Sequence, residues 1–101
     1  MGLNIMNNSF NIKKVSLIDI KKKIKVFIKD NFLRGSGLNT FDDNASFMQK
    51  GIIDSTGVLE LVSFVEITFK IKVEDEELIP DNLDSLNKIA TYTISKITNA
   101  G

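Results

Sequence analysis

The clearest pattern of apolar and polar positions in the chain lies between residues 55 and 70, and it has the period of a helix. Apolar side chains spaced three or four residues apart fall on one face of an α-helix. Asp54 stands directly before this stretch, where its carboxylate can accept hydrogen bonds from the unpaired amides of a first turn. The pattern therefore predicts a helix from about residue 55 to 70. Its inward face consists of Val58, Leu61, Val62, Val65 and Phe69.

Two other stretches predict helices, one on each side of this one. The first extends from about residue 17 to 33, with Ser16 at its start and Gly35 shortly after its end. The last helix follows Asp84, which we expect to be its N-cap. The buried stripe of the first helix consists of Ile20, Ile24, Phe27, Ile28 and either Phe32 or Leu33. The buried stripe of the last consists of Leu86, Ile89, Ala90, Thr93 and Ile97.

The segments between these helices are shorter or irregular. Glu74 to Glu77 predict a short helix, because acidic side chains suit the positive end of a helix, and Pro80 is expected to end it. Residues 34 to 53 predict a long loop, and loops of this length are usually functional. We expect Phe47 to anchor this loop to the core.

Together these elements predict an all-α fold. We expect a four-helix bundle, with three longer helices, one short helix and a long loop after the first helix. The folded domain is predicted to cover residues 16–98, between an N-terminal tail at 1–15 and a C-terminal tail at 99–101. A chain of 101 residues is long enough for a modest core without disulfides or metals.

The composition limits the catalytic and metal-binding chemistry that the chain can support, because it contains neither Cys nor His. Disulfide bonds, thiolate catalysis, imidazole bases and ordinary zinc sites are therefore excluded. A serine nucleophile would have no imidazole to activate it. We expect a protein that is not an enzyme and that has no metal site.

Charge is distributed unevenly, although the net charge is zero. Residues 1–50 hold nine Lys or Arg and four Asp or Glu, and residues 51–101 hold four and nine, so the halves carry +5 and −5. The lysines of the first helix lack interleaved aromatic residues that could stack on bases, so a solvated face is favoured over nucleic-acid binding. Docking to an acidic patch on a partner is the alternative. The lysines concerned are Lys21, Lys22, Lys25 and Lys29.

The stretch from Gly51 through Asp54 and Ser55 into an apolar helix with acidic outer residues resembles the acyl and peptidyl carrier protein family. The signature of that family is Gly-x-Asp-Ser-Leu, and the resemblance covers about residues 16 to 97. Here two residues separate Gly51 from Asp54, and Thr56-Gly57 replaces the Leu and its polar follower. Gly57 in a first helical turn costs about 1 kcal/mol relative to Ala, so its surroundings must offset or tolerate it.

The resemblance implies that Ser55 carries 4'-phosphopantetheine, taken from coenzyme A, and that Asp54 flanks it as a helix cap. The thiol of this arm would hold an acyl, aminoacyl or peptidyl cargo as a thioester. The implied partners are a phosphopantetheinyl transferase, an acyl- or aminoacyl-activating ligase, and a downstream synthase or transferase. The resemblance also implies that partners recognise the outer face of the second helix. The residues on that face are Leu59, Glu60, Ser63, Glu66 and Ile67.

Other interpretations remain beside this one. A carrier-like helical interaction module would keep the bundle without ever being modified. Ser85 lies in a literal Asp-Ser-Leu tripeptide, but too few residues follow it to complete a carrier domain.

No apolar run approaches the roughly 20 residues that a membrane-spanning helix needs. With no export signal recognised, we expect a cytoplasmic monomer that binds neither membrane nor nucleic acid.

Overall fold

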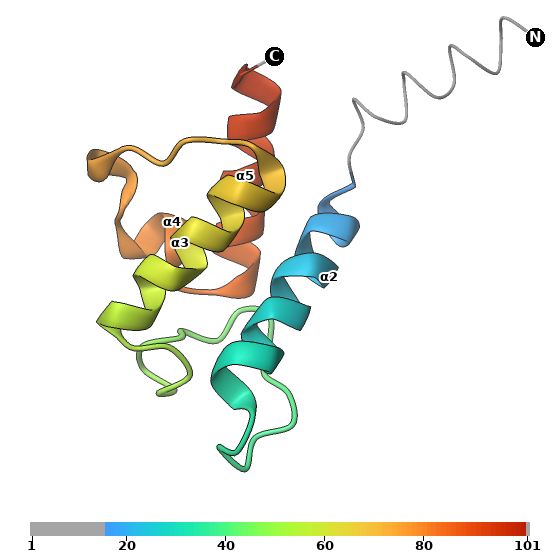
Figure 1. Ribbon diagram of the computed structural model, residues 1–101, viewed down its shortest axis with the longest axis vertical. Coiled ribbons are helices and arrows are strands. Elements are labelled where there is room, and N and C mark those ends of the chain that lie inside the picture. Colours follow the sequence, from blue (N-terminus) through green and yellow to red (C-terminus); the bar gives the residue numbers. More distant parts are fainter. Residues whose placement is uncertain (1–15, 101) are drawn as a thin grey trace, which may run out of the picture.

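The computed structural model describes residues 16–100, with only the backbone of Ala100, and these residues form helices joined by turns and loops (Figure 1). The expected all-α class is confirmed for this part of the chain, which contains no strand. The tail predicted at residues 1–15 lies outside the described residues. At the other end, α5 continues to Ala100, two residues past the predicted domain end.

The first helix has the predicted extent but changes its geometry near its end. Helix α2 (Leu17–Ile28) begins after Ser16, whose side chain accepts a hydrogen bond from the Ile18 amide at 3.0 Å. A π-helical turn, η1 (Lys29–Leu33), follows directly. Leu33 is buried and Phe32 is half-buried, so both residues face the core where the sequence predicted one or the other.

Helix α3 (Ser55–Phe69) lies antiparallel to α2, as the colours of Figure 1 show. The two helices meet through aromatic side chains. The Phe27 and Phe64 rings stack with their centroids 4.2 Å apart and an angle of 17° between their planes. Phe64 was not part of the predicted inward stripe, because it falls between the core face and the outer face of the helix.

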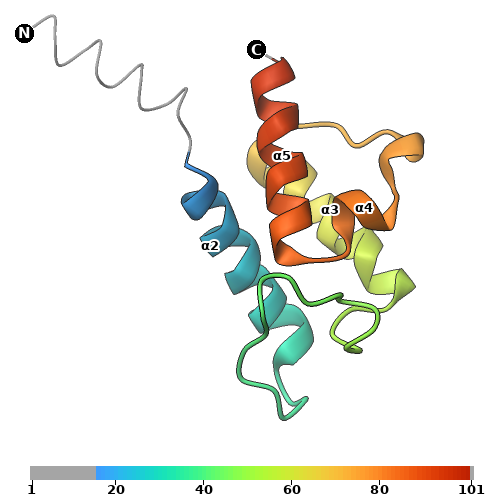
Figure 2. The same ribbon diagram turned by 180° about the vertical axis from the view of Figure 1, so that it is seen from behind.

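Helix α5 (Leu86–Ala100) closes the core against α2, and the view from behind shows the two helices side by side (Figure 2). Ile20, Ile24 and Ile28 of α2 are fully buried and Phe27 is half-buried, which confirms the predicted stripe. Thr93 is also fully buried, and its Oγ1 has no hydrogen-bond partner among the described residues. The predicted burial of Phe47 in the long loop is confirmed as well.

The segment between α3 and α5 differs from the prediction. Lys70 ends α3 in the left-handed conformation (φ 57°), and a single 3₁₀ turn, η2 (Asp75–Glu77), follows an extended stretch. Pro80 was expected to end a helix, but it begins one, α4 (Pro80–Leu83). Proline suits a first helical position, because the amide it lacks would have no partner there.

The predicted N-cap of the last helix is wrong by one residue. Ser85 occupies the N-cap position, and its Oγ accepts a hydrogen bond from the Lys88 amide at 3.1 Å. Asp84 ends α4 instead, and its carboxylate turns toward the long loop. Both residue types cap helices well, so local preference could not separate them.

The sequence predicted that Lys21, Lys22, Lys25 and Lys29 all face water, but Lys21 and Lys25 are only partly exposed. The Lys21 ammonium lies 2.6 Å from one carboxylate oxygen of Asp43, and the Lys25 ammonium lies 3.6 Å from the other. These ion pairs hold the long loop against α2, and the Lys21 hydrogen bond lowers the pKa of Asp43. Lys22 and Lys29 are exposed as predicted.

Candidate functional site

Ser55 is the first residue of α3, and its side chain is exposed. Asp54 caps the helix as predicted. Its Oδ1 accepts a hydrogen bond from the Gly57 amide at 2.7 Å, and its carbonyl oxygen accepts one from the Val58 amide at 3.0 Å. The unpaired amides of a first turn and the helix dipole favour a negatively charged group at this end. The local electrostatics therefore suit a phosphate on the Ser55 hydroxyl.

The loop before Ser55 is fixed by a buried apolar anchor. The Ile52 amide donates to the Phe47 carbonyl oxygen at 2.8 Å, and Phe47, Ile52 and Ile53 are all buried. Gly51 turns the chain here with a φ of +67°, a conformation that glycine adopts without strain from a Cβ. The turn and the anchor together determine where α3 begins.

Gly57 lies at a close contact between the start of α3 and the end of the first helix. A Cβ at this position would approach Phe32 Cε1 to 2.8 Å and Ile53 Cγ2 to 2.9 Å. The absence of a side chain therefore lets Phe32 lie against the first turn of α3. This contact supplies the local reason for a glycine where helix propensity alone disfavours one.

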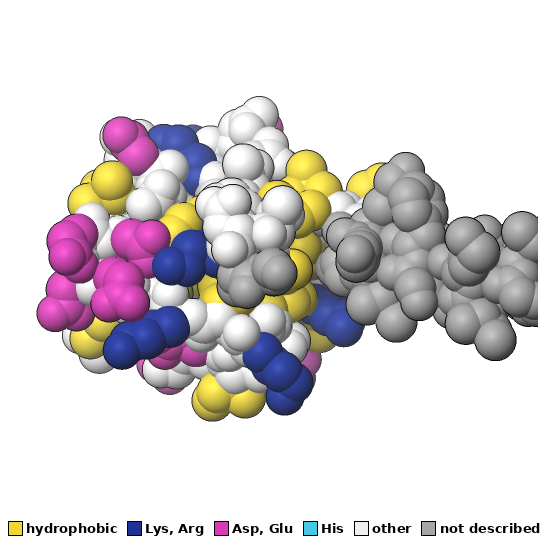
Figure 3. Space-filling view, turned by 90° about the horizontal axis from the view of Figure 1, so that it is seen from above, with side chains coloured by type: hydrophobic (Ala, Val, Ile, Leu, Met, Phe, Trp, Pro, Cys, Tyr) yellow, Lys and Arg dark blue, Asp and Glu magenta, His cyan; other side chains and the backbone are white. Residues whose placement is uncertain are grey.

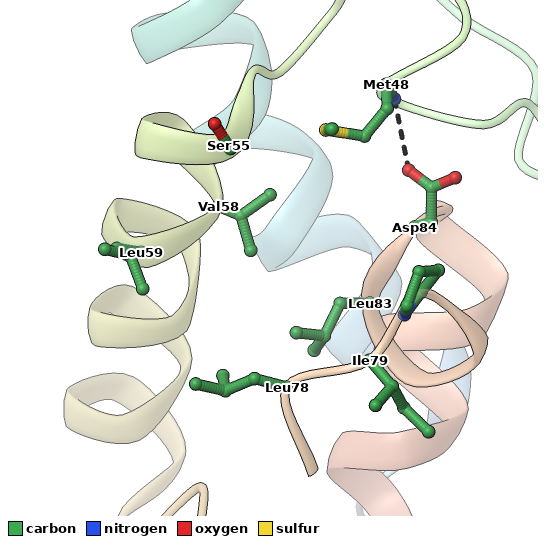
Figure 4. A pocket seen from close by; sticks show the side chains of 9 residues that line it. Met48, Ser55, Val58, Leu59, Leu78, Ile79, Leu83 and Asp84 are labelled. Carbon is green, nitrogen blue, oxygen red and sulfur yellow. Dashed lines mark hydrogen bonds between the residues drawn. The ribbon is translucent and has the colours of Figure 1, made fainter. Parts of the chain in front are cut away.

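An apolar pocket of about 260 Å³ opens beside Ser55. Val58 and Leu59 of α3 line one side of it, and Leu78, Ile79 and Leu83 line the other (Figure 4). The pattern of residues along the chain did not predict this pocket. Leu78 and Ile79 follow an acidic run without any helical period, so only their apolar character could have indicated a role.

Glu77 anchors the segment that forms the outer wall of this pocket. Its carboxylate accepts hydrogen bonds from the Tyr92 hydroxyl and the Lys96 ammonium of α5, both at 2.9 Å. Its carbonyl oxygen accepts another from the Asn82 amide group at 3.0 Å. These contacts hold the neighbouring residues 78 and 79 in place over the pocket.

The contacts around Glu77 shift the pKa of its carboxyl group and the pKa of the Tyr92 hydroxyl in opposite directions. Hydrogen bonds from the Glu74 amide, then from Lys96 and Tyr92, lower the pKa of Glu77 to about 2. Burial and the hydrogen bond to Glu77 raise the pKa of the Tyr92 hydroxyl. Glu77 is therefore ionised, and Tyr92 neutral, at neutral pH.

Asp84 connects the long loop to the rim of the pocket. Its carboxylate accepts hydrogen bonds from the Ser46 hydroxyl and from the Met48 amide, the latter at 3.1 Å (Figure 4). Its carbonyl oxygen accepts one from the Phe47 amide at 2.9 Å. Met48 and Asp84 both line the pocket, so this connection shapes its mouth.

Four of the five residues predicted for partner recognition are exposed on α3, beside two different hollows. Leu59 is 58% exposed and lines the pocket beside Ser55. Glu60, Ser63 and Ile67 are exposed on a separate groove toward α2. Glu66 does not project outward as predicted, because its carboxylate accepts a hydrogen bond from the Val73 amide at 2.9 Å. Its role in the structure is to hold the chain that leaves α3.

Ser85, in the second Asp-Ser pair, is buried with only 3% of its surface exposed. Its hydroxyl caps α5, as described above, which leaves Ser55 as the exposed serine of the two pairs.

Acidic side chains gather on the side of the molecule where η2 lies (Figure 3). Within residues 16–100, no group of three or more Asp or Glu side chains is arranged to hold a metal ion.

Over the same residues, no helix has both the length and the apolar character that crossing a bilayer requires. Comparison of the chain with protein-family models and with curated proteins gives no match.

Proposed function

We propose that this protein is an acyl, aminoacyl or peptidyl carrier, with 4'-phosphopantetheine attached to Ser55. The observation that carries the proposal is the position of Ser55. Its exposed hydroxyl stands at the capped start of α3, on the edge of an apolar pocket. A serine that served only as part of a cap would have no need of such a pocket.

The residues at the site fit the attached group. The first turn of α3 favours a phosphate, and the exposed hydroxyl leaves room for the arm to extend into solvent. The apolar walls at Val58, Leu78 and Leu83 suit the hydrocarbon part of the arm or of its cargo. When bound, the arm would supply the thiol that holds the cargo as a thioester. The protein itself would position this thiol and would not catalyse a reaction.

The proposal includes a set of partners. A phosphopantetheinyl transferase would modify Ser55, a ligase would load the arm, and a synthase or transferase would receive the cargo. A cytoplasmic monomer would suit this exchange, because coenzyme A is used in the cytoplasm and each enzyme must reach the same serine in turn. Leu59 is the recognition residue closest to the reaction, because it lines the pocket that Ser55 borders.

The test is the intact mass of the protein after incubation with coenzyme A and a phosphopantetheinyl transferase of broad specificity. We expect a gain of roughly 340 Da, the mass of the arm added at a hydroxyl. Ser55→Ala should abolish this gain while its helical circular dichroism stays unchanged, and Ser85→Ala, if it folds, should still be modified. Modification of the Ser55→Ala variant would refute the assignment. Failure of the wild type with several transferases would favour an unmodified interaction module.

Partner recognition by the exposed face of α3 has its own test. Glu60 is exposed, and charges at the rim of an interface mainly set the rate of association. Glu60→Lys should therefore slow modification at low salt by about threefold to tenfold, with a smaller effect at high salt. Lys29→Gln provides the contrast on the basic side. A loss with Lys29→Gln and none with Glu60→Lys would assign recognition to α2.

A further inference from the structure

A second hollow lies between α2 and α3 and shares no residue with the pocket beside Ser55. It consists of two adjoining pockets of about 420 and 400 Å³, both lined by Phe64 and Thr68. We refer to this hollow as the α2/α3 groove. Glu60 lies at one end of it, and Lys22 and Lys23 lie at the other.

The centre of the α2/α3 groove is apolar and open to solvent. Ile67 is 77% exposed and Val26 is 58% exposed, one on each helix of the groove. Phe64 lies between them and is only partly buried, although its ring stacks on Phe27. Single exposed apolar residues are ordinary, but a cluster that spans two helices marks an interaction surface.

The charges of the groove have opposite signs at its two ends. Because α2 and α3 are antiparallel, Lys22 and Lys23 lie beside Thr68, whereas Glu60 lies beside Asn31. The eight residue steps from Glu60 to Thr68 extend about 12 Å along a helix. The apolar centre therefore separates a basic end from an acidic end.

This arrangement is complementary to itself. A two-fold axis through the apolar centre would place the basic end of one copy on the acidic end of the other, at both ends of the contact. Phe64, midway between Glu60 and Thr68, would lie nearest the axis, with the exposed side chains of Val26 and Ile67 packed around it. A partner that carried one sign of charge would match only one end.

We propose that the α2/α3 groove is a self-association surface, through which two copies of this chain form a two-fold dimer. A strip of this length covers less than the roughly 800 Å² per partner of standard stable interfaces. The dimer is therefore reversible and depends on concentration. It would cover Glu60 and Ile67 and leave Ser55 free, so the monomer remains the form that enzymes recognise through this face.

Sedimentation velocity of the full unmodified chain tests the proposal between about 10 μM and 1 mM, a range that brackets weak association. We expect the average sedimentation coefficient to rise with concentration for the wild type. Ile67→Asp should abolish this rise. Leu38→Asp is the matched control, because Leu38 is also exposed, at 46%, but lies in the long loop away from the groove. Its self-association should equal that of the wild type.

A charge exchange tests the two-fold arrangement. The double variant Lys22→Glu/Lys23→Glu and the single variant Glu60→Lys should each stay monomeric, because both ends of each dimer would then repel. Mixing the two variants should restore a dimer, because every contact regains opposite charges. All three substituted side chains are exposed, and circular dichroism verifies that each variant is folded.

The result is independent of the proposed carrier function, because no arm or transferase is needed. A wild type that stays monomeric up to 1 mM would overturn the proposal, as would a mixture that fails to associate. Association of Ile67→Asp at wild-type strength would assign the contact to another face. Binding of monomers to vesicles of anionic phospholipid, without dimers, would assign the groove to a membrane surface and refute the proposal.

Discussion

Replacing Gly57 with alanine has two opposing effects on the free energy of unfolding, and the structure allows their sizes to be compared. Alanine is favoured over glycine in a helix by about 1 kcal/mol. Against this gain, the new Cβ would lie 2.8 Å from Phe32 Cε1 and 2.9 Å from Ile53 Cγ2. Forcing an extra methyl group into a close-packed site costs about 1–3 kcal/mol.

The two partners of the new methyl group differ in their freedom to move. Phe32 is half-buried, so its ring can swing outward at a modest cost. Ile53 is 1% exposed, and its Cγ2 is bound directly to Cβ, so it can move only by a rotation about χ1 that the close-packed core opposes, or with the backbone before Asp54. We therefore expect the clash to exceed the propensity gain. Gly57→Ala should lower the free energy of unfolding by about 1 kcal/mol.

Urea denaturation followed by circular dichroism measures this difference, and it corresponds to a decrease in melting temperature of about 4–8 °C for a domain of this size. Thr68→Ala, at an exposed position of the same helix, is the control for propensity and should be neutral or slightly stabilising. Gly57→Ala combined with Phe32→Leu should lose less than the sum of the single variants, because the smaller side chain relieves the contact. A Gly57→Ala protein more stable than the wild type would refute the reasoning.

Two further predictions concern the cap and the wall of the pocket. Asp54→Ala should cost about 1 kcal/mol of unfolding free energy through loss of the cap, and a decrease in the modification rate beyond that expected from the unfolded fraction would show a second role for Asp54 at Ser55. Glu77→Gln should destabilise the protein at neutral pH. Because the folded-state pKa of Glu77 is lowered to about 2, its contribution is complete above the unfolded-state pKa and is lost as the pH falls through the folded one. The difference between wild type and Glu77→Gln in urea denaturation should therefore shrink from pH 5 to about pH 2, and a difference that grows over this range would contradict the assigned contacts.

The sequence by itself determined the main helices and the position of Ser55. The 3.6-residue period of apolar side chains located the core faces of α2, α3 and α5, because burial of those side chains dominates the stability of a small domain. Asp54 indicated the start of α3, because a cap satisfies amides only a few residues away. These features depend on near neighbours in the chain, so a sequence pattern contains them.

Tertiary structure decided the features that depend on residues far apart in the sequence. Asp84 caps no helix N-terminus because its carboxylate binds the long loop, through contacts with Ser46 and Met48, which are 38 and 36 residues away in the sequence. The inward turn of Glu66 depends on the Val73 amide after the end of its helix. The reason for Gly57 became visible only when Phe32 was placed against it. The preference of a residue for a helix, a cap or a loop cannot identify such contacts. Each of these side chains is compatible with several environments, and the residue that it contacts in the folded protein determines which one it occupies.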